Sequence, residues 1–274
     1  MYMYIVDRIK KEAYRRRLSH KTTKAYIFWI KRFLKFSKKS HQSLTKKDVR
    51  LFIEQLSEKG LAGNTLNVAL ASINFFVEWV LNKRWKLSIR YSKTPKTIAV
   101  FLTRQEIIKL FSAVQNQKHK LMLALMYSAG LRVSELVHLK VSDLQVKEGY
   151  GWVRQGKGNK DRVFIIAARL KEELVEWAKG LDKNSYLFLG NNNCHITVRT
   201  VQEIIKSNAK KAGIRKNVHP HTLRHSFATH IAEKGHASTV IQGLLGHVSP
   251  ETSLQYIHSA SPKMFKVKSP YDEL

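Results

Sequence analysis

Large hydrophobic residues recur at helical spacing through the first ninety residues, and no other feature constrains the fold as strongly. Three groups show the pattern: Trp29, Phe33 and Phe36; Phe52, Ile53 and Leu56; and Phe76, Trp79 and Val80. A period near 3.6 places such residues on one face of a helix. We therefore predict a bundle of helices in which these side chains form the core rather than a surface for base stacking.

The helical pattern is interrupted before residue 100 and then resumes. Residues 60–64 (GLAGN) separate two of the first helices, and residues 83–99, which include Pro95, have no clear period. Thr103, followed three residues later by Glu106, is the capping-box pattern that begins a helix. A chain of 274 residues can bury two cores. We predict a helical domain over 1–90, a linker over 91–100 and a second domain over 101–274.

The second domain is expected to mix helices with a small sheet. We expect a helix up to about Ala129, a turn at Gly130 and a short helix from Ser134. The GKGNK segment, residues 156–160, has glycines that permit the positive φ angles of a hairpin, and it is no P-loop because no GK[ST] follows. The predicted fold class is therefore mainly α with a small β-sheet (α+β). The hairpin strands are expected near residues 152–154 and 163–166, with helices after them.

The chain is strongly basic, with 49 Lys and Arg against 20 Asp and Glu, a formal net charge of +29. Residues 1–90 hold 21 basic and 6 acidic side chains, which leaves 28 and 14 for the remainder. The excess is thus shared by both domains rather than confined to a tail. Such a charge favours a polyanionic partner, and we expect nucleic acid.

Two further features concern the cellular compartment. Cys194 is the only cysteine, so an internal disulfide and a Cys-rich zinc module are excluded, as in a protein of a reducing compartment. No apolar run approaches the roughly 20 residues that span a bilayer, and the first residues have too short an apolar stretch for a signal peptide. We expect a cytoplasmic protein without a membrane partner.

Four short segments carry residues suited to phosphate chemistry. Arg132 follows Gly130 and precedes Glu135 by three residues, so its guanidinium is either held by that carboxylate or available to a phosphate. In the HTLRH segment, His221, Arg224 and His225 share one helical face. The hairpin segment contributes Lys157.

The fourth segment is LLGHVSPETSLQYIH, residues 244–258. His247 follows a glycine that can end a helix, and Ser249 with Pro250 suits the start of another, which places Tyr256 on its second turn. Each residue alone also fits an ordinary role, such as an ion pair, an exposed histidine or a packed tyrosine. Together, two arginines, two histidines, a loop lysine and a tyrosine are the parts needed for phosphoryl transfer without a metal.

These residues and their order resemble the tyrosine recombinase (integrase) family, and their spacing is similar to that of its Xer-like members. The GLR-x-SEL, GKGNK, H-x-L-R-H and LLGH segments all match the family pattern. The resemblance implies a nucleophilic tyrosine nine residues after the last segment, and an acidic companion, Glu135, for the first arginine. The implied catalytic residues are Arg132, Lys157, His221, Arg224, His247 and Tyr256.

The resemblance also implies an architecture and a reaction. It implies a helical, SAM-like core-binding domain and a catalytic domain that close on double-stranded DNA like a clamp, with four subunits assembled on two sites. Cleavage would form a 3′-phosphotyrosine and proceed through a Holliday junction without metal, ATP or other cofactor. Its use would be chromosome or plasmid dimer resolution, or integration and excision of a mobile element. Further DNA contacts are expected from Arg15, Arg16, Arg17, Lys21 and Lys160.

Three alternatives remain open at the level of sequence. A topoisomerase-like enzyme would use the same chemistry but reseal the same strand. A non-catalytic DNA-binding descendant would have the same charge and fold. A metal-dependent nuclease could use a histidine-rich ligand set, although HTLRH lacks the glutamate of HExxH. Its candidate ligands are His219, His221, His225 and His230.

Overall fold

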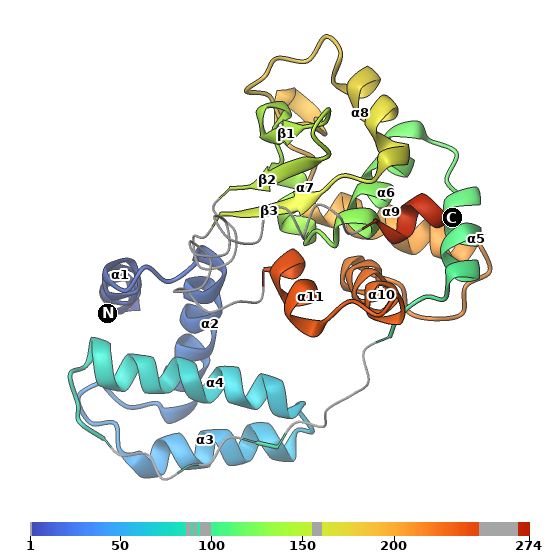
Figure 1. The fold of residues 1–274 in the computed structure, drawn as a ribbon. Coiled ribbons are helices and arrows are strands. Elements are labelled where there is room, and N and C mark those ends of the chain that lie inside the picture. The colour runs from blue at the N-terminus through green and yellow to red at the C-terminus, as the bar shows by residue number, and fades with distance from the viewer. Residues whose placement is uncertain (1, 86–88, 90–91, 94–99, 155–160, 247–267) are drawn as a thin grey trace. The chain divides into compact units, whose positions relative to one another are not determined.

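The computed structural model describes residues 2–85, 89, 92–93, 100–154, 161–246 and 268–274. The chain forms two compact units, residues 1–97 and residues 98–274, and their division falls inside the segment predicted as a linker. Figure 1 shows a first unit made of helices and a second that adds a small sheet. The predicted fold class, mainly α with a small β-sheet, is confirmed.

The first unit is helical throughout its described elements. Ser19 begins the second helix by accepting a hydrogen bond from the Thr22 amide, and Thr45 and Asp48 form a capping box on the third. The predicted aromatic core is present, with the Phe33 and Phe52 rings in contact at a centroid distance of 5.4 Å and an interplanar angle of 54°. The elements are α1 (Tyr2–Arg15), α2 (His20–Ser37), α3 (Lys46–Glu58), α4 (Gly63–Phe75) and a π-helical turn, η1 (Phe76–Val80).

Trp79 departs from the predicted core. Its side chain is 44% exposed, whereas Phe76 and Val80 are buried. The π-helical turn explains the difference, because its wider winding rotates residues away from the face that a 3.6-residue period predicts. The exposed ring is covered instead by the guanidinium of Arg16, whose Cζ lies 3.1 Å from the ring centroid.

The second unit surrounds a small antiparallel sheet with helices. Its strands are β1 (Leu144–Gln145), β2 (Tyr150–Val153) and β3 (Arg162–Ile165), in the order β1-β2-β3. Val153 and Arg162 form the last pair between β2 and β3, and the GKGNK segment predicted to connect the strands lies outside the described residues. The predicted strand pair is confirmed within two residues, whereas β1 was not predicted. The helices are α5 (Arg104–Ser112), α6 (Gln117–Ala129), α7 (Val133–His138), α8 (Lys171–Ala178), α9 (Val198–Lys211), α10 (Pro220–Glu233) and α11 (Ser238–Leu245), with short turns η2 (Val141–Asp143), η3 (Ala168–Leu170), η4 (Asn191–Asn193) and η5 (Pro270–Glu273).

The helix expected to end near Ala129 is in fact two helices. The capping box of Thr103 and Glu106 begins α5, as predicted, but α5 ends at Ser112. The Asn116 side chain then accepts a hydrogen bond from the His119 amide and begins α6. An asparagine N-cap competes with a continuous helix at that point, and the sequence reasoning missed it.

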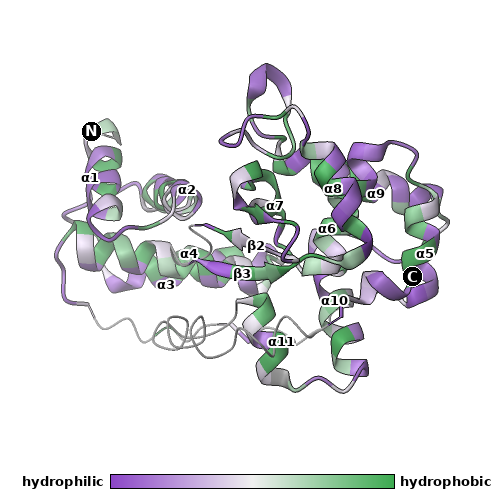
Figure 2. Ribbon diagram, turned by 45° about the horizontal axis from the view of Figure 1, so that its top comes forward, coloured by the Kyte–Doolittle hydropathy of each residue, from purple (hydrophilic) through white to green (hydrophobic). Residues whose placement is uncertain are grey.

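The core of the second unit is centred on α6. Every residue from Leu121 to Ala129 is buried, and α6 packs against α10. Figure 2 shows the largely hydrophobic colouring of α6 beside the more hydrophilic α9. Because α6 is enclosed, the turn that follows it at Gly130 is held at a fixed place in the unit.

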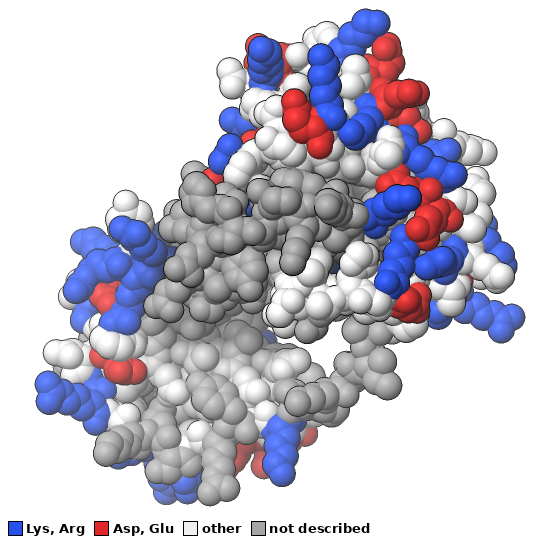
Figure 3. Space-filling model, viewed as in Figure 1, with Lys and Arg blue, Asp and Glu red and all other residues white. Residues whose placement is uncertain are grey.

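The basic side chains are distributed over both units, as the sequence predicts. Figure 3 shows Lys and Arg side chains over both units on the face drawn. Cys194 is free and exposed. Among the described residues, no helix combines the length and apolar character needed to cross a membrane.

Candidate active site

The site is built around one carboxylate, that of Glu135. Gly130 adopts the left-handed conformation, φ 59°, and ends α6, so the chain reverses and α7 begins after Arg132. Glu135 Oε2 accepts a hydrogen bond from the Arg132 backbone amide at 2.8 Å, and Oε1 accepts one from Arg132 Nη1 at 2.7 Å. Arg132 is thus held by this carboxylate, one of the two outcomes that the sequence left open.

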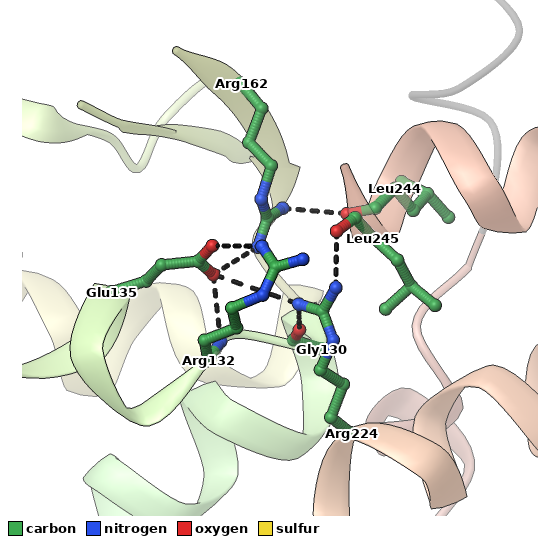
Figure 4. A network of polar contacts seen from close by, with 7 residues as sticks. All are labelled: Gly130, Arg132, Glu135, Arg162, Arg224, Leu244 and Leu245. Atoms are coloured by element: carbon green, nitrogen blue, oxygen red, sulfur yellow. Dashed lines mark hydrogen bonds and ion pairs between the residues drawn. The ribbon is translucent and has the colours of Figure 1, made fainter. Parts of the chain in front are cut away.

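Arg224 reaches the same place from α10. Its Nη1 donates to the Gly130 carbonyl at 2.6 Å and lies 3.9 Å from Glu135 Oε2, and its Nη2 donates to the Leu245 carbonyl. The residue is 4% exposed. Arg132 and Arg224, 92 positions apart in the sequence, therefore lie beside one carboxylate (Figure 4).

A third guanidinium, that of Arg162, completes the cluster. Its Nη2 donates to Glu135 Oε2 at 2.6 Å, and its Nη1 donates to the Leu244 carbonyl at 2.7 Å. The sequence reasoning missed this residue. The sequence does contain a signal for it. Side chains two positions apart in a strand lie on the same face, so Arg162 shares a face with the buried Phe164 and occupies a position where a hydrophobic residue is expected. An arginine at such a position needs a buried acidic partner.

The charges in the cluster do not balance. The single carboxylate of Glu135 lies within 4 Å of three guanidinium groups. Burial alone would raise the pKa of Glu135, but the adjacent Arg162 and Arg132 outweigh burial and hold its pKa below the usual range. Burial, followed by repulsion from Arg132 and Arg162, lowers the pKa of Arg224 to about 9. Guanidinium groups stay protonated in proteins, so three arginines and one carboxylate give the cluster a formal net charge of +2, which favours an anion.

His221 stands on α10, one turn before Arg224. It is exposed, as is His225, and their ring centroids are 6.4 Å apart. Partial desolvation, followed by the charges of His219, His225 and the two arginines, lowers the pKa of His221. The imidazole is therefore neutral at pH 7, and a neutral imidazole can accept a proton.

The remaining predicted site residues fall in two groups. Lys157, Lys160, His247 and Tyr256 lie outside the described residues. The predicted DNA contacts of the first unit lie at and after the end of α1: Arg15 and Arg16 pair with Glu12 at 3.1 and 2.9 Å, Arg17 follows, and Lys21 is in the first turn of α2. The structure brings together Arg132, Glu135, Arg224 and His221, and adds Arg162.

The histidine-rich ligand set of the nuclease alternative is not assembled. His230 is buried, and its Nδ1 is 2.8 Å from the Tyr127 hydroxyl, whereas His221 and His225 are exposed. Among the residues that the structure describes, no three His, Cys, Asp or Glu side chains are grouped so that they could bind a metal ion.

Comparison with known proteins gives the class. Residues 100–262 match the phage integrase family, and residues 5–87 match the N-terminal SAM-like domain of phage integrases. A tyrosine recombinase of Pseudothermotoga lettingae is 33% identical over 261 residues, 91% of each chain. Tyrosine recombinase XerA of Pyrococcus horikoshii is 35% identical over 242 residues, 87% of this chain and 83% of XerA.

A solved structure agrees with these matches in fold. A lambda integrase tetramer bound to a Holliday junction has 22% sequence identity, a TM-score of 0.70 and coverage of 90% of this chain and 77% of the integrase chain. The chain belongs to the phage integrase family. Within that family it is a tyrosine recombinase of the Xer-like type, and so a site-specific recombination enzyme.

Proposed function

We propose that the chain cleaves and rejoins double-stranded DNA at a specific site through a covalent bond between Tyr256 and a 3′ phosphate. The observation that carries the proposal is the cluster of three guanidinium groups around Glu135, in which three positive charges face one negative charge. A pentavalent phosphorus transition state gains charge on its nonbridging oxygens, and guanidinium forks fit those oxygens. Arg132 and Arg224 take this role, and His247 adds a donor.

The covalent step is balanced in atoms and protons. The Tyr256 oxygen forms a bond to phosphorus as the bond from phosphorus to the 5′ oxygen breaks. A tyrosine hydroxyl has an unperturbed pKa of about 10, so it needs a proton acceptor, and the neutral His221 fits that role. Lys157 protonates the departing 5′ oxygen. A 5′ hydroxyl from the partner duplex then attacks the phosphotyrosine, re-forms the phosphodiester and releases Tyr256. The phosphotyrosyl ester keeps the energy of the broken bond, so no ATP is needed, and the arginines take the place of a metal ion.

The proposed assembly is four subunits on two DNA sites, with a Holliday junction as the intermediate. The lambda integrase neighbour, a tetramer on such a junction, supports this arrangement. Residues 1–90 serve as the core-binding domain, 91–100 as the linker and 101–274 as the catalytic domain. Arg15, Arg16, Arg17, Lys21 and Lys160 contact DNA.

Trapping on a nicked DNA substrate tests the proposal. The parent enzyme is expected to form a covalent adduct in excess chelator, and Tyr256→Phe is expected to bind DNA with parental affinity but form none. An adduct in the phenylalanine variant would move the nucleophile elsewhere. Activity that requires a divalent ion would instead support the nuclease alternative.

Lys157 has a test of its own. Lys157→Ala is expected to cleave normal DNA about 10²- to 10⁴-fold more slowly, the usual contribution of a proton donor. A 5′ bridging sulfur is a leaving group that needs no proton, so it is expected to restore Lys157→Ala but not Arg132→Ala. Equal rescue of both variants, or of neither, would make Lys157 a phosphate contact and Lys160 the next candidate.

The products separate the remaining uses. A recombinase is expected to join strands of two duplexes, whereas a topoisomerase-like enzyme would relax supercoiled DNA without joining partners. Covalent complexes mapped on genomic DNA at one chromosomal or plasmid site would indicate dimer resolution. Complexes at the ends of a mobile element would indicate integration and excision.

A further inference from the structure

Arg162 is a nearly buried charged residue that the reaction described above does not use. It begins β3, and its side chain is 11% exposed. Its two terminal nitrogens donate to Glu135 and to the Leu244 carbonyl, and its Nε is buried without a hydrogen-bond partner among the described residues. A buried charge is costly, so its retention at the end of a strand calls for an explanation.

The first contact of Arg162 leads to Arg132. Glu135 accepts from Arg162 through Oε2 and from the Arg132 side chain through Oε1. The two guanidinium groups are therefore held by opposite oxygens of one carboxylate (Figure 4). A rotation of Glu135 would release both, so Arg162 fixes the carboxylate that fixes Arg132.

The second contact of Arg162 leads to the end of α11. Leu244 is in the last turn of α11, and Gly246 ends the helix with φ 62°. Gly246 packs directly on Arg162, because a Cβ atom there would lie 2.5 Å from Arg162 Cδ. Positive charge also suits the C-terminal end of a helix, where carbonyl groups have no intrahelical partner. Arg162 thus fixes the chain immediately before His247 in the sequence.

We propose that Arg162 is a positioning residue for strand cleavage: it orients Arg132 through Glu135 and holds the end of α11 through Leu244, without contacting the scissile phosphate. This inference rests on the proposed function. The charge of Arg162 is matched by the carboxylate at 2.6 Å, whereas Arg224 lies 3.9 Å from the same carboxylate and donates to carbonyl groups.

The first experiment measures covalent cleavage by Arg162→Gln over a range of DNA concentrations. The cleavage rate at saturating DNA is expected to fall by about 10- to 100-fold, by analogy with the loss of partners that orient metal-ligating side chains. The half-saturating DNA concentration is expected to stay at the parental value, because no phosphate contact is lost. A parental cleavage rate in a folded Arg162→Gln protein would overturn the inference.

Two further variants separate positioning from general stability. Arg162→Lys keeps the charge beside Glu135 but cannot make both contacts, so it is expected to recover part of the rate, and it carries the test if the glutamine variant does not fold. Arg154→Gln is the matched control, since Arg154 directly follows β2 and its exposed side chain pairs with Asp161 at 2.9 Å. An equal loss of rate in the control would show that hairpin stability, not Glu135, is responsible.

The pH profile of cleavage gives a readout that a purely structural role would not move. The charged groups that face Glu135 are Arg132, Arg162 and Arg224. Loss of Arg162 removes two of the interactions that lower the pKa of Glu135, so this pKa is expected to rise from its value in the parent, and a protonated Glu135 would hold Arg132 less firmly. The acidic limb of the profile is therefore expected to move to higher pH in Arg162→Gln and to return in Arg162→Lys. An unmoved limb in Arg162→Gln would count against action through Glu135.

A double-mutant cycle and a neutral substrate complete the test. If Arg162 acts through Glu135, Arg162→Gln combined with Glu135→Gln is expected to lose little more activity than either variant alone, whereas multiplied losses would oppose the inference.

A methylphosphonate lacks one charged oxygen and is expected to relieve Arg132→Ala more than Arg162→Gln. Preferential relief of Arg162→Gln would make Arg162 a phosphate contact. Tyr256→Phe in the same assay tests the proposed function separately, because an adduct there would refute it whatever Arg162 does.

Discussion

Glu135→Gln is expected to lower the stability of the second unit strongly, although the two side chains have nearly the same shape. The change keeps the shape of the side chain but removes the negative charge that faces Arg132, Arg162 and Arg224. Breaking a buried ion pair by removing one partner costs about 3–5 kcal/mol, because the other charge stays buried. For a unit of this size, each kcal/mol lowers Tm by about 2–4 °C, so a fall of about 6–20 °C is expected.

Glu106→Gln is a matched control within the same unit. Glu106 also occupies the third position of its helix, completes a capping box and pairs with a cation at 2.6 Å, in this case Lys216. Its side chain is 25% exposed and Lys216 is 38% exposed, so its loss is expected to cost about 1 kcal/mol or less. The comparison isolates the effect of burial among several guanidinium groups.

Calorimetry and urea unfolding of the full chain measure both variants. Both substitutions lie in the second unit, so the unfolding transition whose Tm changes in the two variants is assigned to that unit. Inorganic sulfate is expected to raise the Tm of Glu135→Gln more than that of the parent, since an added anion replaces part of the missing charge. Equal losses in Glu135→Gln and Glu106→Gln would refute the idea that the buried carboxylate neutralises the cluster.

Three other predictions follow from charge, backbone conformation and titration. DNA binding is expected to weaken steeply with salt through counterion release, and a log-log slope near zero would oppose it. Gly130→Ala is expected to lower the free energy of unfolding by about 2–4 kcal/mol, since φ is 59° and the new Cβ would lie 2.6 Å from Phe227 Cδ1. Gly213→Ala is the control: φ is 69° but the space around it is open, so a loss of about 1 kcal/mol is expected. Chemical unfolding measures both. Burial lowers the pKa of His225 and of His230 in the folded protein, so the unfolded chain binds more protons as the pH falls through about 6.5. Tm is therefore expected to fall as the pH drops from 7.5 towards 5.5. A rise in Tm over this range would contradict the prediction.

Much of the fold could be predicted because hydrophobic spacing and capping residues are local signals. Thr103 with Glu106 gave the start of α5, and Gly130 gave the turn before α7. Trp79 and the division between α5 and α6 could not be predicted, because a π-helical turn and an asparagine cap override the average helical period. Both errors arise where one residue changes the winding that periodicity assumes to be constant.

The site divides in a similar way. Arg132, Glu135, His221 and Arg224 were found from motifs, and the structure brings them together. Arg162 was missed because its partner, Glu135, is 27 positions away and its role depends on a tertiary contact. Lys157, His247 and Tyr256 stay predictions, since they lie outside the described residues.

The arrangement around Glu135 places guanidinium groups where the proposed reaction needs positive charge beside a phosphate. The arginines are oriented by partners of the fold itself: one carboxylate and the carbonyl groups of Gly130, Leu244 and Leu245. Neutral carbonyl groups fix a guanidinium in place without cancelling its charge. Repulsion among three guanidinium groups beside one carboxylate lowers the stability of the folded protein, and an anion placed there is expected to offset this repulsion. In the proposed reaction the nonbridging oxygens gain negative charge as phosphorus becomes pentavalent, so the attraction to the arginines is greatest at the transition state. Stronger binding of the transition state than of the substrate is the condition for catalysis.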